Sequence, residues 1–349
     1  MLLAGACAPR APESAPGTSA AAAETPDPAV VLARGVPRPW GLASDGAFAY
    51  WTVLATGEIV RAAADGTAPA PVAKDDMMAT GCAVDADSVY WLSGTGVMKA
   101  PKAGGASRVL VPEPAMSAAK APIALDATHV YWIDAHGWLR RAPKDGGPAQ
   151  SLGHAGIAPS AMAVDATHAW WTDELGGVRR VRKEGGAPTE DFAAHEPGLD
   201  DLALDGAYVY WTNVDAVRRA PKSGGAALTV YRGDVVSGLA VDDQSVFTTT
   251  RPLSSAGEPG EARIVRIPKD GRAPPVEARA GVWGTSVDRV YLAIGAATLF
   301  VAVDAMGAGG GVLSVAGPGY TGPVPPPSGA PPKFEGAVFR MAKDFAARP

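Results

Sequence analysis

Val209-Tyr210-Trp211-Thr212-Asn213 is one copy of a pattern that recurs along this chain of 349 residues. Its second aromatic residue returns after 40, 41, 39 and 40 residues, at Trp51, Trp91, Trp132, Trp171 and Trp211. A period of about 40 residues with strand-like units is typical of β-propellers, in which each repeat is one blade. The pattern therefore predicts an all-β ring of repeated blades.

Each copy lies within a unit of four strand-like runs. In the unit around Trp211, an apolar run ends at Asp205, the Tyr-Trp run follows, a basic run ends near Lys222, and a weaker run covers residues 228–231. Turns such as Ser223-Gly224-Gly225 separate the runs. Glycine supplies the positive φ that tight hairpins need, so four short runs between such turns predict a four-stranded blade.

Two positions recur in every unit and give the number of blades. The Asp that ends the first run is assigned to Asp45, Asp85, Asp126, Asp165, Asp205, Asp242 and Asp288. A basic residue of the third run is assigned to Arg61, Lys99, Arg141, Arg180, Arg219, Arg266 and Arg340. Both sets predict a seven-bladed β-propeller. Repetition favours a scaffold role, in which the Asp caps its turn and pairs with the basic residue to join strands or blades.

The last unit ends without a fourth strand. An open sheet edge would result unless another segment completed the blade. Residues 30–35 precede the first unit and resemble a fourth strand, so we expect them to complete the last blade and close the ring. Residues 29–349 are thus predicted to be one propeller with a long insertion at about 293–335. The apolar stretch 298–303 of that insertion is interpreted as the start of an extra hairpin.

The segment Leu2-Leu3-Ala4-Gly5-Ala6-Cys7 is similar to the end of a bacterial lipoprotein signal, where small residues precede a lipidated cysteine. The resemblance implies export to the cell envelope or periplasm and lipidation of Cys7. Residues 8–28, rich in Ala, Pro, Ser and Thr, complete a predicted region 1–28 of truncated signal and disordered tether. A charged n-region is missing, so an ordinary disordered tail with an idle cysteine stays open as the alternative.

Charge and hydropathy limit the classes of partner. The net charge is −5 and only 19% of residues are charged, without a basic tract, so no nucleic acid is expected. No apolar run approaches the ~20 residues of a membrane-spanning helix, which leaves a lipid anchor as the expected membrane contact. The motifs of P-loop enzymes, GxSxG hydrolases and HExxH metalloproteases are absent from the sequence. We expect a monomer.

Binding residues are expected on one face of the ring. Loops that enter the innermost strands and loops between the second and third strands share that face, which we call the loop face. The pattern places these candidates there: Trp40, Asp134, His136, Asp173, Glu174, Asp200, Asp201, Asp215 and Trp283. Carboxylates around one mouth could hold Ca²⁺ or attract a cationic ligand, and no other cofactor is expected. A solvated acidic rim without a ligand is the alternative.

The runs Val130-Tyr131-Trp132-Ile133-Asp134 and Trp170-Trp171-Thr172-Asp173 resemble the YWTD repeats of low-density-lipoprotein-receptor class B propellers. The resemblance covers about residues 36–344. It implies a propeller that binds a protein or peptide, although fold alone is weak support for function. That family has six blades and adjoining EGF-like cysteine modules, whereas this chain has seven predicted blades and no such modules.

Two kinds of function remain. The first is a non-enzymatic binding or scaffold propeller at the bacterial cell envelope. The second is a metal-dependent propeller hydrolase or lyase, of the lactonase or streptogramin-lyase sort, in which Glu, Asp, Asn or His from several innermost strands hold a divalent metal. The innermost runs here offer mostly Ala, Leu, Val, Gly and Ser, with Asp200 and Asp201 as exceptions, and this composition favours the first function.

Overall fold

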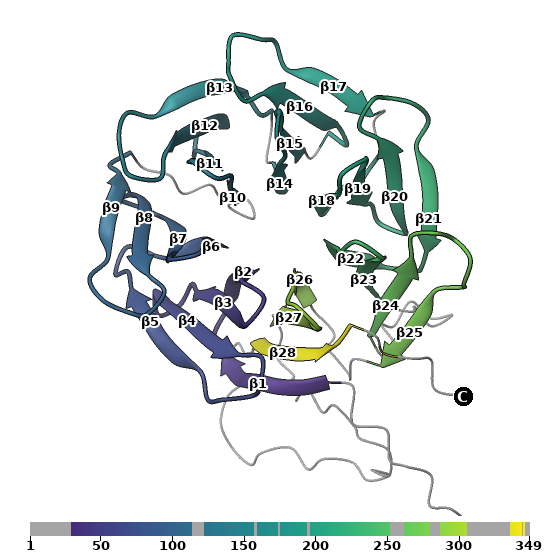
Figure 1. The fold of residues 1–349 in the computed structure, drawn as a ribbon, viewed down its shortest axis with the longest axis horizontal. Helices are drawn as coiled ribbons and strands as arrows, with labels where there is room; N and C mark the ends of the chain where they lie inside the picture. The colour runs from purple at the N-terminus through teal and green to yellow at the C-terminus, as the bar shows by residue number, and fades with distance from the viewer. Residues whose placement is uncertain are drawn as a thin grey trace, which may run out of the picture.

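The computed structural model describes residues 29–113, 122–156, 159–173, 175–193, 196–251, 262–279, 287–305, 336–343 and 345. Within these ranges, 28 strands form seven four-stranded sheets around a central axis (Figure 1). The predicted all-β, seven-bladed propeller is confirmed. No helix among the described residues has the length and apolar character needed to span a bilayer.

Each blade runs from an innermost to an outermost strand (Figure 1). The first three blades are β2 (Pro39–Ser44), β3 (Phe48–Val53), β4 (Glu58–Ala63) and β5 (Ala70–Lys74); β6 (Thr80–Val84), β7 (Ser88–Ser93), β8 (Gly96–Pro101) and β9 (Arg108–Val111); and β10 (Ile123–Leu125), β11 (His129–Ile133), β12 (Trp138–Pro143) and β13 (Gln150–His154). The next three are β14 (Ala161–Val164), β15 (His168–Thr172), β16 (Val178–Arg182) and β17 (Glu190–Ala193); β18 (Leu202–Leu204), β19 (Tyr208–Thr212), β20 (Ala216–Pro221) and β21 (Leu228–Arg232); and β22 (Val236–Val241), β23 (Ser245–Thr250), β24 (Arg263–Pro268) and β25 (Val276–Arg279).

The seventh blade joins the two ends of the chain. It contains β26 (Val287–Ile294), β27 (Thr298–Ala305), β28 (Gly336–Ala342) and, as its outermost strand, β1 (Ala29–Val36). β1 pairs antiparallel with β28, so that Val30 lies opposite Arg340 (Figure 1). The predicted closure of the ring by an N-terminal strand is therefore confirmed.

The register of the seventh blade differs from the one expected. Phe300 of β27 lies opposite Arg340, as Tyr50 lies opposite Arg61 in the first blade. Phe300 is therefore the counterpart of the recurring tyrosine. Tyr291 lies on the innermost strand β26.

The recurring Asp of the seventh blade was also misassigned. Asp45 donates its backbone N–H to the carbonyl of Phe48, and Gly295 makes the equivalent bond to Thr298. Gly295 therefore occupies the position of the recurring Asp, and the assignment to Asp288 is wrong. The error arose because the bulged start of β26 places an Asp shortly before a Val-Tyr pair, which imitates the repeat.

The apolar stretch at the start of the predicted insertion belongs to the propeller itself. Residues 298–305 form β27, which pairs with both β26 and β28, so the interpretation of residues 298–303 as an extra hairpin is wrong. The rest of that insertion, residues 306–335, lies outside the described residues, as does the predicted signal and tether at 1–28.

The repeated aromatic pairs fill the spaces between neighbouring blades. Tyr131 of the third blade and Trp171 of the fourth are both 0% exposed and share one apolar cluster with Leu152 and Val181. The Trp171 indole donates its N–H to the buried carbonyl of Ala155, 2.7 Å away. Aromatic burial of this kind supplies much of the packing energy between sheets.

The carboxylate of the recurring Asp caps the turn that follows it and also forms an ion pair with a lysine of the next blade. In the fifth blade, Oδ1 of Asp205 accepts the backbone N–H groups of Ala207 and Tyr208 at 2.8 and 2.7 Å. Its Oδ2 accepts the hydroxyl of Tyr210 at 2.8 Å and lies 2.6 Å from Nζ of Lys269 in the sixth blade. The expected cap of the turn is present, and the ion pair joins two blades.

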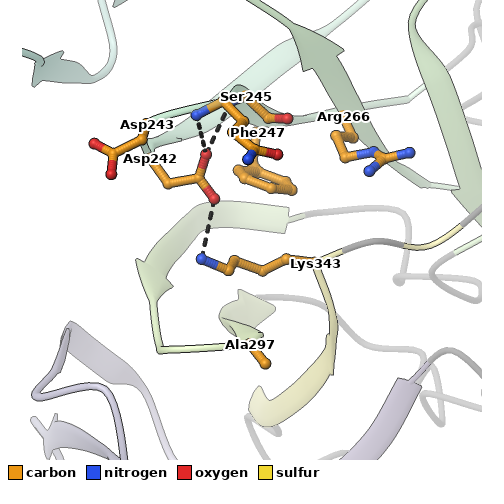
Figure 2. Close-up of a pocket in the computed structure, with 8 residues that line it drawn as sticks. Asp242, Asp243, Ser245, Phe247, Arg266, Ala297 and Lys343 are labelled. Carbon is orange, nitrogen blue, oxygen red and sulfur yellow. Dashed lines mark hydrogen bonds and ion pairs between the residues drawn. The ribbon is translucent and has the colours of Figure 1, made fainter.

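Six such ion pairs connect neighbouring blades among the described residues. They are Asp45–Lys102, Asp85–Lys144, Asp126–Lys183, Asp165–Lys222, Asp205–Lys269 and Asp242–Lys343. Figure 2 shows the last of them, with the Asp242 carboxylate between the backbone N–H of Ser245 and Nζ of Lys343. We call this set the inter-blade ion pairs; it lies on the face opposite the loop face.

The prediction that the recurring Asp pairs with the basic residue of the third run is wrong. The basic residue of the third run does not pair with the Asp; instead Nη1 of Arg61 donates to the backbone carbonyl of Lys102 at 2.7 Å. The same Lys102 holds Asp45 through its ammonium group. One lysine thus receives two contacts from the preceding blade, and Arg180 and Lys222 repeat the arrangement at 2.8 Å.

Neutralising one inter-blade ion pair should weaken the ring in a pH-dependent way. Burial raises the pKa of Asp205, but hydrogen bonds from Lys269, from backbone N–H groups and from Tyr210 outweigh it and bring the pKa from its ordinary 3.8 to about 2. A lowered pKa gives stability that is complete above pH 4 and is lost as the pH falls towards 2. After a discount for solvent screening, this is about 1 kcal/mol.

Asp205→Asn keeps the oxygen that caps the turn and removes the charge. We expect it to lower the free energy of unfolding by about 1 kcal/mol at pH 7 and to have almost no effect near pH 2, where wild-type Asp205 is half protonated or more. Urea unfolding across this pH range measures the difference. A constant difference between the two proteins from pH 7 to pH 2 would contradict the charge-based explanation.

Candidate functional site

Residues in or next to the innermost strands of six blades line an open cavity of about 140 Å³ at the centre of the ring. Most of its wall is apolar or small: Gly41, Leu42, Gly81, Cys82, Pro122, Ile123, Ser160, Ala161 and Met162. Larger polar groups come from Trp40, Asp201 and Tyr291. A Cβ atom on Gly41 would lie 2.8 Å from the backbone nitrogen of Cys82, so β2 and β6 approach too closely for any side chain there.

Cys82 is not a reactive group of this cavity. Burial raises the pKa of its thiol to about 12, so the thiol stays protonated at neutral pH. A nucleophilic cysteine needs a thiolate, which this environment disfavours. The residue fits the expected role of a small buried apolar side chain.

Two arginines lie close to the ring of Trp40, which lines the cavity. The guanidinium carbon of Arg289 is 3.8 Å from the centroid of the Trp40 ring, and that of Arg38 is 5.2 Å from it. Trp40 opens β2, and Arg289 lies near the start of β26, so the loops that enter two innermost strands bring these groups together. Only 9% of Trp40 is exposed.

Buried hydrogen-bond donors collect around this tryptophan. The indole N–H of Trp40, Nε of Arg38, Nη1 of Arg289 and the hydroxyl of Tyr291 have no hydrogen-bond partner within the described part of the chain. Burial raises the pKa of Tyr291, outweighing the Arg289 guanidinium, so its hydroxyl keeps its proton at neutral pH. We call Arg38, Trp40, Arg289 and Tyr291 the channel-mouth cluster.

Two carboxylates border the channel-mouth cluster. Oδ2 of Asp304, at the end of β27, is 4.0 Å from Nε of Arg38. Asp201, across the cavity, accepts the backbone N–H of Leu202 at 2.8 Å and that of Leu239 at 3.0 Å. Asp201 thereby links the innermost strands of the fifth and sixth blades, and both of its oxygens are engaged.

Most of the predicted acidic rim is part of the scaffold. Asp134 accepts the N–H groups of His136 and Trp138 and forms an ion pair of 2.9 Å with Arg140. Burial opposes ionisation of Asp134, but these bonds outweigh it and hold the pKa of its carboxyl below the ordinary value. The carboxylate therefore caps its own turn, and His136 is exposed beside it.

Asp173 and Asp215 also pair within their own blades. Asp173 is 0% exposed and lies 2.9 Å from Nε of Arg179, and Asp215 lies 2.6 Å from Nη1 of Arg232. Asp200 is half-buried at the loop before β18, where its N–H donates to the carbonyl of Thr212. These carboxylates are spread over the fourth and fifth blades, and among the described residues they form no group that could hold a metal ion.

Trp40 and Asp201 are the predicted candidates that the structure brings to one cavity. The other predicted positions Glu174, Trp283 and Cys7 lie outside the described residues. Within the described ranges, no three His, Cys, Asp or Glu side chains are grouped closely enough to hold a metal ion.

The sequence did not single out Arg38, Arg289, Tyr291 or Asp304. Arg38 could have been placed on the loop face, because it lies two residues before Trp40. The others come from the seventh blade, whose register had been misread, so no local pattern indicated that they lie beside a residue 250 positions earlier.

Comparisons with known proteins support the fold. No family model matches the chain, and no curated protein matches it. Virginiamycin B lyase from Staphylococcus aureus superposes with a TM-score of 0.57 at 13% identity, covering 90% of this chain and 98% of the lyase. YCF48 bound to D1 peptide gives 0.59 at 11% identity, covering 90% of this chain and 96% of the other. At these identities the matches show a propeller fold and nothing finer.

A chain of the nidogen/laminin complex matches over 55% of this chain and 80% of its own length, at 18% identity and a TM-score of 0.47. That superposition is too partial to argue from. The chain is thus a seven-bladed propeller, and the comparisons agree with that fold.

Proposed function

We propose that this protein is a non-enzymatic binding propeller that recognises a protein or peptide on its loop face, at the mouth of the central cavity. The observation that carries the proposal is the channel-mouth cluster: an aromatic ring approached by two guanidinium groups, with buried donors that have no partner in the described chain. Aromatic and arginine side chains are the groups that most often anchor protein interfaces.

The solved propellers offer a precedent for this mode of binding. YCF48 is described in complex with a peptide, on a fold that covers 90% of this chain. The described carboxylates support binding rather than metal chemistry, since Asp134, Asp173 and Asp215 are already held by arginines of their own blades. We further propose export to the bacterial envelope or periplasm as a monomer, with lipidated Cys7 as its membrane attachment.

Panning a displayed random-peptide library against the purified protein tests the binding function. Hydrogen–deuterium exchange of the complex with a selected peptide then locates the site. We expect protection in the loops before β2, β18 and β22, and none in the opposite turns such as Asp205–Tyr208. Protection confined to the opposite face, or no selected peptide at all, would contradict the proposal.

A metal-dependent lyase is the second candidate, because the superposition on virginiamycin B lyase covers 98% of that enzyme. Thermal unfolding with Ca²⁺, Mg²⁺ or EDTA separates the two functions, since a metal that binds only the folded state must raise the midpoint. We expect no shift at millimolar metal. A shift of several degrees that EDTA reverses would favour the lyase, or a Ca²⁺ site on the loop face.

A further inference from the structure

The two arginines of the channel-mouth cluster approach the ring of Trp40, which lines the cavity together with Tyr291. A guanidinium group that stacks on an indole uses its flat face, which leaves its in-plane N–H groups free for hydrogen bonds. Arg289 stacks most closely, with 3.8 Å between its guanidinium carbon and the ring centroid, and its Nη1 is buried without a partner in the described chain. The guanidinium group is therefore held against the indole ring while its Nη1 has no acceptor among the described residues.

The donors that lack a partner belong to the four side chains of the channel-mouth cluster. Trp40 is more than nine-tenths buried, and its indole N–H, Nε of Arg38 and the Tyr291 hydroxyl lack partners within the described residues, like Nη1 of Arg289. A buried donor without an acceptor is costly, so native proteins rarely keep several together unless water or a ligand satisfies them. Among the described residues, these four donor groups lie beside a single buried carboxylate, Asp304, that is 4.0 Å from Nε of Arg38, and they favour a ligand that brings further acceptor oxygens.

The two neighbouring carboxylates, Asp304 and Asp201, do not accept hydrogen bonds from these donors. Nε of Arg38 is 4.0 Å from Oδ2 of Asp304, which is longer than a hydrogen bond. Asp201 directs its two oxygens at the N–H groups of Leu202 and Leu239. Neither contact gives the bidentate pairing that a guanidinium group makes with a free carboxylate.

The backbone at Arg38 is held in a conformation that a non-glycine residue rarely adopts. Its φ is +59°, in the left-handed region, and its carbonyl accepts the N–H of Leu54. Such conformations are energetically unfavourable and are found at ligand-binding positions more often than elsewhere. Glycine would relieve this strain.

We propose that the channel-mouth cluster binds a carboxylate group, held by Arg38 and Arg289 and accepting hydrogen bonds from Trp40 and Tyr291. The cavity of about 140 Å³ has room for roughly five water molecules, so it takes one end of a ligand and not a folded partner. The inference rests on the proposed binding function and specifies its ligand: a peptide with a free C-terminal carboxylate, or a small carboxylic acid that offers the same group.

Thermal unfolding with small carboxylates tests the site itself. The probes are acetate and succinate at up to 100 mM, against chloride at equal ionic strength. We expect succinate to raise the midpoint of the wild type by about 2 °C or more, as millimolar affinity for the folded state requires. Arg289→Gln should abolish this rise, and Arg272→Gln is the matched control, because it removes the same charge from an 88%-exposed side chain on the opposite face.

A second variant keeps the test informative if Arg289→Gln does not fold. Arg38→Gly removes a guanidinium group while relieving the positive φ, so we expect a folded protein that no longer responds to succinate. No rise in the wild type, or an equal rise in Arg289→Gln and Arg38→Gly, would overturn the proposal and leave water as the partner of these donors.

Peptides from the library separate the carboxylate inference from the binding function. Each selected sequence is synthesised with a free C-terminus and with an amidated one. We expect amidation to weaken binding at least 10-fold, and Arg289→Gln to remove that preference. Equal binding of both forms, with protection on the loop face, would overturn the carboxylate inference while the binding function stands. A succinate response without any bound peptide would instead assign the site to small carboxylic acids and contradict the peptide function.

Discussion

A protein that begins at Pro37, without β1, is expected to be unfolded or close to it at room temperature. Leu32 and Val36 of β1 are buried against the seventh blade and the first, with 7% and 6% of their surfaces exposed. Burial of two such side chains contributes about 1.5–3 kcal/mol each, and a domain has only about 5–15 kcal/mol in total. Loss of β1 also leaves β28 as an open edge.

A chain that begins at Ala29 is the matched control, because it keeps every residue of β1. Circular dichroism and urea unfolding of both proteins measure the difference. A synthetic peptide of residues 29–36 should restore part of the lost stability in trans, since its site on β28 would be vacant. Equal urea midpoints for the two proteins would show that the ring does not depend on its N-terminal strand.

The predictions from the sequence agree best with the structure at side chains that have the same structural role in every blade. Trp171 and Trp211 recur because each space between blades must be filled, and the turn at Asp205 recurs because each first hairpin needs a cap. Their recurrence therefore predicts the ring, and the basic residue of the third run, which keeps its place as Arg340 in the seventh blade, completes the number of blades. The period fails in the seventh blade, where Gly295 replaces the Asp and Phe300 replaces the tyrosine.

The partners of the repeated polar groups could not be predicted in the same way. Sequence spacing places Asp205 and Arg219 at one level of a blade, but the ion pair forms with Lys269 of the next blade. Arg219 instead donates to the backbone carbonyl of that lysine. Which basic residue pairs with the Asp depends on how far one sheet is rotated relative to the next. The sequence of a single repeat does not reveal that rotation.

The candidate site depends on contacts between the chain ends. Arg38 and Arg289 are about 250 residues apart and meet at Trp40 only because β1 closes the seventh blade beside the first. Asp134 and Asp173 each pair with an arginine six residues later across the hairpin, Arg140 and Arg179. The sequence-based prediction counted the acidic groups of the loop face but not the arginines that pair with them. It therefore overestimated the negative charge at the mouth of the cavity.

Trp171→Ala should destabilise the protein by about 3–5 kcal/mol, the usual cost of removing a fully buried tryptophan. The side chain is 0% exposed and packs against Tyr131, Leu139 and Leu152 of the preceding blade. The resulting cavity would therefore loosen a contact between two blades. Because the blades of a ring are stabilised by their neighbours, we expect one cooperative transition at a lower urea concentration.

Two further variants separate the causes of this loss. Trp138→Ala removes a tryptophan that is 41% exposed, so it should change the free energy of unfolding by about 1 kcal/mol or less. Trp171→Phe keeps most of the apolar area but loses the indole N–H that donates to the Ala155 carbonyl, and should cost about 1–2 kcal/mol. If Trp171→Ala were no worse than Trp138→Ala, packing between the third and fourth blades would not be what holds this part of the ring, and the inter-blade ion pairs would have to carry it.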